Sequence, residues 1–143
     1  MTRAEFIAVI ALLVSALAFG LSFYVAFRDR AKIVARSKFW PASEYGPAGM
    51  RISITNAGRR PIVLRMIVTV GEAGNWSGTY LGDYKTGLRL GEHELHEETW
   101  GKSDLVIGPE HDEIAVDAQV EDSLGRRYPV KDAKKNMLTL LGS

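Results

Sequence analysis

The longest apolar run of the chain lies within its first 27 residues. The segment "FIAVIALLVSALAFGLSFYVAF", residues 6–27, has 22 residues and no charged side chain. As a helix with a rise of about 1.5 Å per residue it would extend about 33 Å, which matches a hydrocarbon core of about 30 Å. The apolar region of a secretory signal peptide is shorter, roughly 7–15 residues. We therefore predict a transmembrane helix at 6–27 after a short tail at 1–5, with a cleaved signal peptide as the alternative.

Basic side chains follow this run directly. Residues 28–38, "RDRAKIVARSK", carry five basic side chains and one acidic one, whereas residues 1–5 carry one of each. Because lysine and arginine near a span favour the cytoplasmic side, this asymmetry predicts a cytoplasmic C-terminal domain. The alternative is a signal anchor with an exported domain.

We interpret residues 28–38 as a juxtamembrane stem. Basic side chains in such a position bind anionic lipid headgroups, each contributing about 1 kcal/mol at the surface. The predicted membrane-surface residues are Arg28, Arg30, Lys32, Arg36 and Lys38.

Small residues recur every three or four positions within the apolar run. Such spacing places them on one stripe of a helix, where they allow a second helix to approach closely. The predicted packing residues are Ala11, Ser15, Ala18 and Ser22. The stripe favours a homo-oligomer or a partner membrane protein, and the plain alternative is the high alanine content of such helices.

Apolar and polar positions alternate with a period of two in the rest of the chain, which is typical of half-buried strands. "MRISIT", residues 50–55, alternates throughout, and "IVLRMIVTV", residues 62–70, is the most β-branched run and predicts a central strand. Between them "NAGRRP" predicts a turn in which Asn56 and Gly58 tolerate positive φ.

The segment "IAVDAQVEDSLGRRYPV", residues 114–130, predicts a hairpin. Ile114, Val116, Ala118 and Val120 share one face by alternation, and we expect that face to be the core face. Pro129 has no amide hydrogen to donate, so we expect the last strand to lie at an edge.

Six to seven short strands with turn residues between them predict an antiparallel β-sandwich of the immunoglobulin-like type at residues 39–131. Residues 132–143, "DAKKNMLTLLGS", predict a C-terminal tail or a short helix.

A resemblance supports this layout. "ISITNAGRRPIVLRMI" and "VEDSLGRRYPV" resemble segments of short bacterial and prophage-encoded membrane proteins with one N-terminal span and an immunoglobulin-like sandwich. Such proteins are mostly of unknown function, and the resemblance implies no catalytic residues. It does imply a bacterial inner membrane as the location.

Composition narrows the function further. The chain contains no cysteine, which excludes disulfides, thiolate zinc sites and cysteine nucleophiles. Residues 39–143 carry 12 basic and 15 acidic side chains, a net charge of −3, so a nucleic-acid-binding role lacks its electrostatic signature.

One histidine pair invites a metal interpretation. His93 and His96 lie three residues apart among glutamates, whereas the zinc-protease pattern places two histidines four apart on a helix. The third histidine, His111, stands in an acidic loop without the regular spacing of a calcium site. We predict no catalytic, metal or cofactor site.

Four arginines stand at two predicted turns, "GRRP" and "GRRY". Arg59, Arg60, Arg126 and Arg127 would converge if the two turns lay at the same end of the domain. Arginine forks bind carboxylates and phosphates, so these residues are possible partner contacts, with ordinary turn solvation as the alternative.

The predicted function is a membrane-anchored, non-catalytic binding or assembly module at the cytoplasmic face of the membrane. Edge strands and aromatics such as Trp76, Tyr80, Tyr84 and Trp100 are further contact candidates. The alternatives are an exported envelope or phage-exclusion factor and a membrane-tethered hydrolase, although no catalytic constellation supports the hydrolase.

Overall fold

The computed structural model describes residues 2–108 and 113–143 and divides the chain into two compact units. The first unit is residues 1–30 and the second is residues 31–143. The loop that contains His111 lies outside the described residues.

The first unit is one helix, α1 (Arg3–Arg28). Thr2 caps its N-terminus in a capping box, because the Glu5 amide donates to Thr2 Oγ1 and the Thr2 amide donates to the Glu5 carboxylate. None of its side chains is buried against the described chain. A helix of 26 residues with this apolar composition is long enough to cross a membrane, and a signal sequence has the same character.

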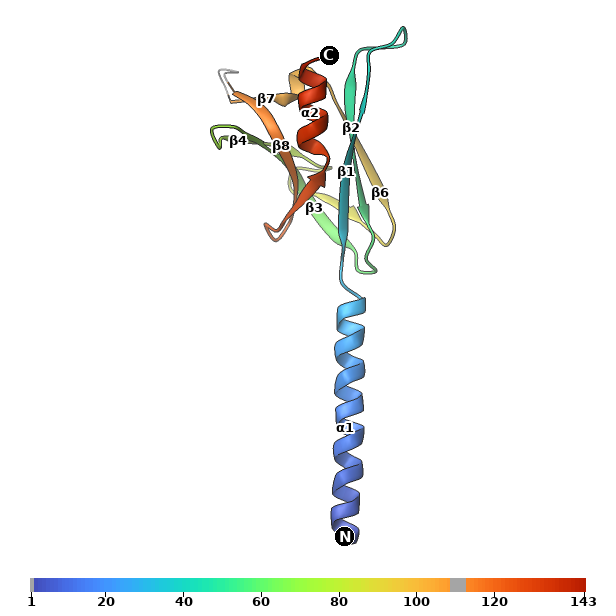
Figure 1. Ribbon diagram of the computed structural model, residues 1–143. Helices are drawn as coiled ribbons and strands as arrows, with labels where there is room; N and C mark the ends of the chain where they lie inside the picture. Colours follow the sequence, from blue (N-terminus) through green and yellow to red (C-terminus); the bar gives the residue numbers. More distant parts are fainter. Residues whose placement is uncertain (1, 109–112) are drawn as a thin grey trace. The chain divides into compact units, whose positions relative to one another are not determined.

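The second unit is built on a curled sheet with one strand order, β4-β3-β8-β9-β1-β2-β6 (Figure 1). β5 extends the β3 edge beside β4, and β7 pairs with the start of β8. The strands are β1 (Ile33–Trp40), β2 (Gly49–Asn56), β3 (Ile62–Gly71), β4 (Trp76–Tyr80), β5 (Leu88–Leu90), β6 (Leu95–Trp100), β7 (Val106–Ile107), β8 (Glu113–Asp122) and β9 (Arg127–Lys131). A short 3₁₀ helix (Lys102–Leu105) precedes β7, and α2 (Ala133–Leu141) ends the chain.

The predicted immunoglobulin-like sandwich is wrong. β9 pairs with β1 in parallel, with Ala35 opposite Val130 and Arg36 opposite Lys131, and this ladder joins the two halves of the domain into one mixed sheet. The result is a half-barrel rather than two separate antiparallel layers (Figure 1). The ladder has only two residue pairs, and the alternation of apolar and polar residues in β1 and β9 does not predict it.

The core fills the concave side of the half-barrel. Met50, Ile52 and Ile54 of β2 are buried, which confirms the alternation predicted for this strand. α2 packs on this core and covers it, since its Met137 and Leu140 have no exposed surface. A helix thus occupies the place that a second sheet would take in a sandwich.

The predicted hairpin forms from β8 and β9, but its core face differs from the prediction. Ala118 and Val120 are buried as expected, whereas Val116 is only half-buried, Ile114 is 47% exposed and Ala115 is buried instead. The cause is a bulge: Val70 pairs with Asp117 and Gly71 with Ala115, so the alternation of β8 shifts by one residue between them.

Pro129 does not place β9 at an edge, because β9 lies between β8 and β1. Pro129 faces Gln119 of β8, and the ladder to β1 begins only at the next residue, Val130. The missing amide hydrogen of Pro129 therefore lies just before the β9–β1 ladder rather than within it.

Candidate functional site: the basic end of the sheet

The two arginine turns lie at the same end of the sheet, where β1 begins. The first turn connects β2 to β3, and the second connects β8 to β9. The Ser123 amide donates to the Val63 carbonyl at 2.9 Å, which joins the second turn to the strand that follows the first. We call the set Lys32, Arg59, Arg60, Arg126 and Arg127 the basic end.

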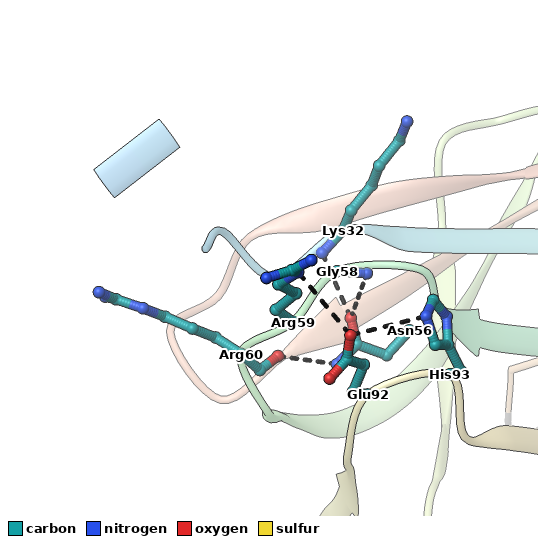
Figure 2. A network of polar contacts seen from close by, with 7 residues as sticks. All are labelled: Lys32, Asn56, Gly58, Arg59, Arg60, Glu92 and His93. Atoms are coloured by element: carbon teal, nitrogen blue, oxygen red, sulfur yellow. Dashed lines mark hydrogen bonds and ion pairs between the residues drawn. The ribbon is translucent and has the colours of Figure 1, made fainter. Parts of the chain in front are cut away.

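The first turn is organised by one buried amide side chain. Asn56 has no exposed surface, and its Nδ2 donates to the Arg60 carbonyl at 2.8 Å and to the Leu90 carbonyl at 3.3 Å. Its Oδ1 accepts from the Gly58 amide at 3.0 Å and from the Lys32 amide at 3.3 Å. Figure 2 shows this carboxamide at the centre of the contacts that hold the turn.

The backbone of Asn56 adds two further links, to the loop before β6. Its amide donates to the Glu94 carbonyl at 3.2 Å, and its carbonyl accepts from the His93 amide at 2.8 Å. His93 adopts φ of 59°, a left-handed conformation that places its amide in this position. Hydrogen bonds of Asn56 therefore connect four chain segments: the start of β1, the β2–β3 turn, the end of β5 and the loop before β6.

The second turn is organised by a buried carboxylate. The side chain of Asp122 has no exposed surface, and its Oδ1 accepts from the Leu124 and Arg126 amides at 2.9 Å each. Its Oδ2 accepts from Arg126 Nε at 2.7 Å and from the Tyr128 hydroxyl at 3.0 Å. The carboxylate thus closes the turn on itself.

These contacts shift the pKa values of Asp122, Tyr128 and Arg126. Burial alone would raise the pKa of Asp122, but the hydrogen bonds from Arg126, Tyr128 and Leu124 outweigh it, and the pKa is lowered overall. The pKa of Tyr128 is raised by burial and by its hydrogen bond to Asp122. The pair with Asp122 likewise raises the pKa of Arg126.

Three of the four predicted arginines have an acidic partner. Arg126 pairs with Asp122, Arg127 Nε lies 3.0 Å from Glu121 Oε2, and Arg59 Nε lies 3.9 Å from Glu92 Oε1. Their positive charge is therefore partly or fully compensated.

Lys32 and Arg60 differ from these three arginines. Within residues 2–108 and 113–143 neither side chain has a carboxylate at ion-pair distance. Both side chains are exposed and extend away from the network in Figure 2. The structure therefore brings the two turns together and, of the five residues of the basic end, leaves Lys32 and Arg60 without an ion-pair partner among the described residues.

The five predicted stem residues lie in three settings. Arg28 ends α1, and the Arg30 guanidinium carbon lies 3.9 Å from the centre of the Phe27 ring. Lys32 joins the basic end. Arg36 and Lys38 are exposed positions of β1.

Arg36 and Lys38 share the outward face of β1 and β2 with Arg51. Arg51 lies 3.5 Å from Glu97 and 5.9 Å from the centre of the Trp40 ring. The cationic side chains of β1 therefore lie in a mixed polar and aromatic surface.

The four predicted packing residues all lie on α1 and are exposed there: Ala11, Ser15, Ala18 and Ser22. No second helix packs on them within the described chain, so their role in helix association stays a prediction.

The histidine region forms no metal cluster in the part of the chain that the structure describes. His96 Nε2 lies 2.7 Å from Glu98 Oε1 on the same face of β6, while His93 belongs to the preceding turn. Trp100 is only 3% exposed and belongs to the core, which removes it from the contact candidates.

Comparisons with known proteins add little. No protein-family profile and no curated protein matches the chain. One solved structure, Northeast Structural Genomics Consortium target SoR45, matches 70% of this chain and 79% of its own, with 10% identity and a TM-score of 0.29. At that TM-score the likeness supports no conclusion about this chain.

Proposed function

We propose that the chain is a membrane-anchored, non-catalytic binding and assembly module, with α1 in a bacterial inner membrane and the half-barrel on its cytoplasmic side. One observation carries the proposal: the 22-residue apolar run at 6–27, exposed on α1, is followed by five basic residues within the next eleven positions. The apolar length suits a span, and the basic flank favours the cytoplasm.

The short connection between the units adds support. Four residues, 29–32, separate α1 from β1, and four residues extend over at most about 14 Å. An α1 embedded in a bilayer therefore tethers the start of β1, and with it the basic end, close to the headgroups. Lys32 and Arg60 are the exposed cations there that have no ion-pair partner among the described residues.

Anchorage and sidedness are tested on the full chain in bacterial membranes. We expect the chain to resist extraction by alkaline carbonate and to keep its N-terminal segment by intact mass. A green fluorescent protein fused after Ser143 should fluoresce, and an alkaline phosphatase fused there should be inactive. A shortened chain released by carbonate, or an active phosphatase, would replace the proposal by an exported domain.

The lipid contact is tested with a fluorophore on Leu124→Cys, since Leu124 is 75% exposed in the β8–β9 turn and the chain has no other cysteine. In bilayer discs, energy transfer to headgroup-labelled lipid should be greater with anionic than with zwitterionic lipid. The double variant Lys32→Ala/Arg60→Ala should lose this difference. The matched control Lys134→Ala/Lys135→Ala removes two charges from α2 and should keep it. Equal transfer in both lipids would contradict the contact.

A further inference from the structure

Among residues 2–108 and 113–143, no strand pairs with the outer side of β4, which is therefore a free edge of the half-barrel. It stands at one end of the strand order, and its five residues pair with β3 without a register shift. β6 stands at the other end of that order. A strand at an edge presents unpaired amide and carbonyl groups to any chain that can approach it.

The two edges differ in their protection. β6 carries His96, Glu97 and Glu98, and charged side chains are a usual defence of an edge strand. β4 has the sequence "WSGTY", with no charge, no proline and no bulge against β3. It also carries exposed aromatics, since Trp76 is 59% and Tyr80 42% exposed. β4 is therefore built like a strand that pairs with another strand.

The pairing of β4 with β3 fixes which groups face outward. The Leu81 amide donates to the Arg65 carbonyl at 2.9 Å, and the Gly71 amide donates to the Asn75 carbonyl at 2.9 Å. Hydrogen bonding alternates along an antiparallel strand, so residues 75, 77, 79 and 81 bond toward β3. The amides and carbonyls of residues 76, 78 and 80 then point to the free edge.

The order of side chains along β4 is the same in both directions by chemical class: aromatic, hydroxyl, glycine, hydroxyl, aromatic. We propose that β4 pairs antiparallel with β4 of a second copy of this chain, around a two-fold axis at Gly78. Trp76 then faces the partner's Tyr80, Ser77 faces the partner's Thr79, and Gly78 faces the partner's Gly78.

This register satisfies the backbone and the side chains together. Residues 76, 78 and 80, whose backbone groups point outward, form the three hydrogen-bonded pairs. Aromatic pairs and Ser–Thr pairs are among the favourable cross-strand combinations, and each occurs twice because of the symmetry. A register shifted by two residues would leave an aromatic ring opposite glycine.

Gly78 keeps the centre of the edge flat. A Cβ atom on Gly78 would lie 2.7 Å from Met66 Sδ, so the Met66 side chain already covers this position and is only 6% exposed. Tyr84 extends the aromatic surface beyond the strand, with its ring 4.6 Å from that of Tyr80. This inference goes beyond the proposed function, because strand pairing depends on neither sidedness nor lipid charge.

The register is tested by disulfide formation between full-length chains in membranes, because the native chain has no cysteine. Ser77→Cys and Thr79→Cys chains, carrying different tags and mixed, should form a disulfide-linked dimer. Their Cα atoms would lie about 4.5 Å apart in a non-hydrogen-bonded pair. Either variant alone places its two cysteines on the order of 8 Å apart, beyond disulfide reach, and should crosslink much less.

The control mixes Ser77→Cys with Thr99→Cys, which places a cysteine at an exposed position of the opposite edge strand. It should not crosslink. Equal crosslinking in all mixtures, or none in the Ser77→Cys and Thr79→Cys mixture, would overturn the proposal.

A charge exchange tests the same pairing without cysteine. Trp76→Lys/Tyr80→Lys places like charges opposite each other and should abolish the dimer. Trp76→Lys/Tyr80→Glu removes the same two rings but places opposite charges together, and should keep it. Equal behaviour of the two variants would refute the register. Both readouts are independent of the topology reporters, so failure of this proposal and failure of the proposed function are distinguished.

Discussion

Asn56→Ala is the substitution that should most clearly reveal how the basic end is held together. Asn56 is fully buried and its side chain makes four hydrogen bonds, of which those to the Arg60 carbonyl and from the Gly58 amide are 3.0 Å or shorter. Alanine removes all four. Lys32 and Arg60 are exposed, so water can replace the bonds lost by their backbone groups.

The Gly58 amide and the Leu90 carbonyl belong to buried residues and would stay unpaired. A buried polar group left without a partner costs about 1–3 kcal/mol. The Leu90 bond is long, at 3.3 Å, and contributes at the low end of this range. We therefore expect Asn56→Ala to lower the free energy of unfolding by about 2–4 kcal/mol.

The assay is urea unfolding of the full chain in detergent, followed by tryptophan fluorescence, to which the buried Trp100 contributes. Asn75→Ala is the matched control, because Asn75 is exposed and its side chain hydrogen-bonds, among the described residues, to Glu113 alone. The control should cost less than about 1 kcal/mol. An Asn56→Ala chain as stable as the Asn75→Ala chain would refute the role assigned to Asn56.

Two further predictions concern the second turn and the β4–β5 connection. Because the pKa of Asp122 is lowered in the folded chain, its contribution is present at neutral pH and is lost as the pH falls below about 4. The urea midpoint should therefore fall with acidification, and Asp122→Asn should flatten this dependence; an unchanged slope would contradict it. A Cβ on Gly87, at φ of 71°, would lie 2.5 Å from the Leu64 carbonyl oxygen, whereas Gly74, at φ of 88°, has open space. Gly87→Ala should thus cost clearly more than Gly74→Ala, which carries only the backbone penalty of about 1 kcal/mol, and equal unfolding midpoints would contradict the clash.

The architecture could be predicted from sequence only in its local parts. The apolar helix follows from an uninterrupted apolar run, and the strand at residues 50–55 follows from its period-two alternation. The parallel contact of Ala35 with Val130 joins residues 95 positions apart and has no local signature. The two-pair ladder that contains this contact turns two expected layers into one curled sheet.

The sequence predicts which residue types form the candidate site, but it does not predict their hydrogen bonds and ion pairs. The turn predicted for Asn56 and Gly58 rested on their tolerance of positive φ, yet neither adopts it. Asn56 acts through its side-chain hydrogen bonds instead. The arginines stood out by repetition, but Lys32 and Arg60 could be separated from the paired arginines only once their partners were placed.

The central claim is that α1 holds the domain at the cytoplasmic side of a membrane, and labelling of Ser143→Cys in spheroplasts with a membrane-impermeant maleimide tests it most directly. The native chain has no cysteine, so position 143 would carry the only thiol. We predict that this thiol stays unlabelled in intact spheroplasts, is labelled after lysis, and sediments with carbonate-washed membranes. Full labelling in intact spheroplasts would contradict the account.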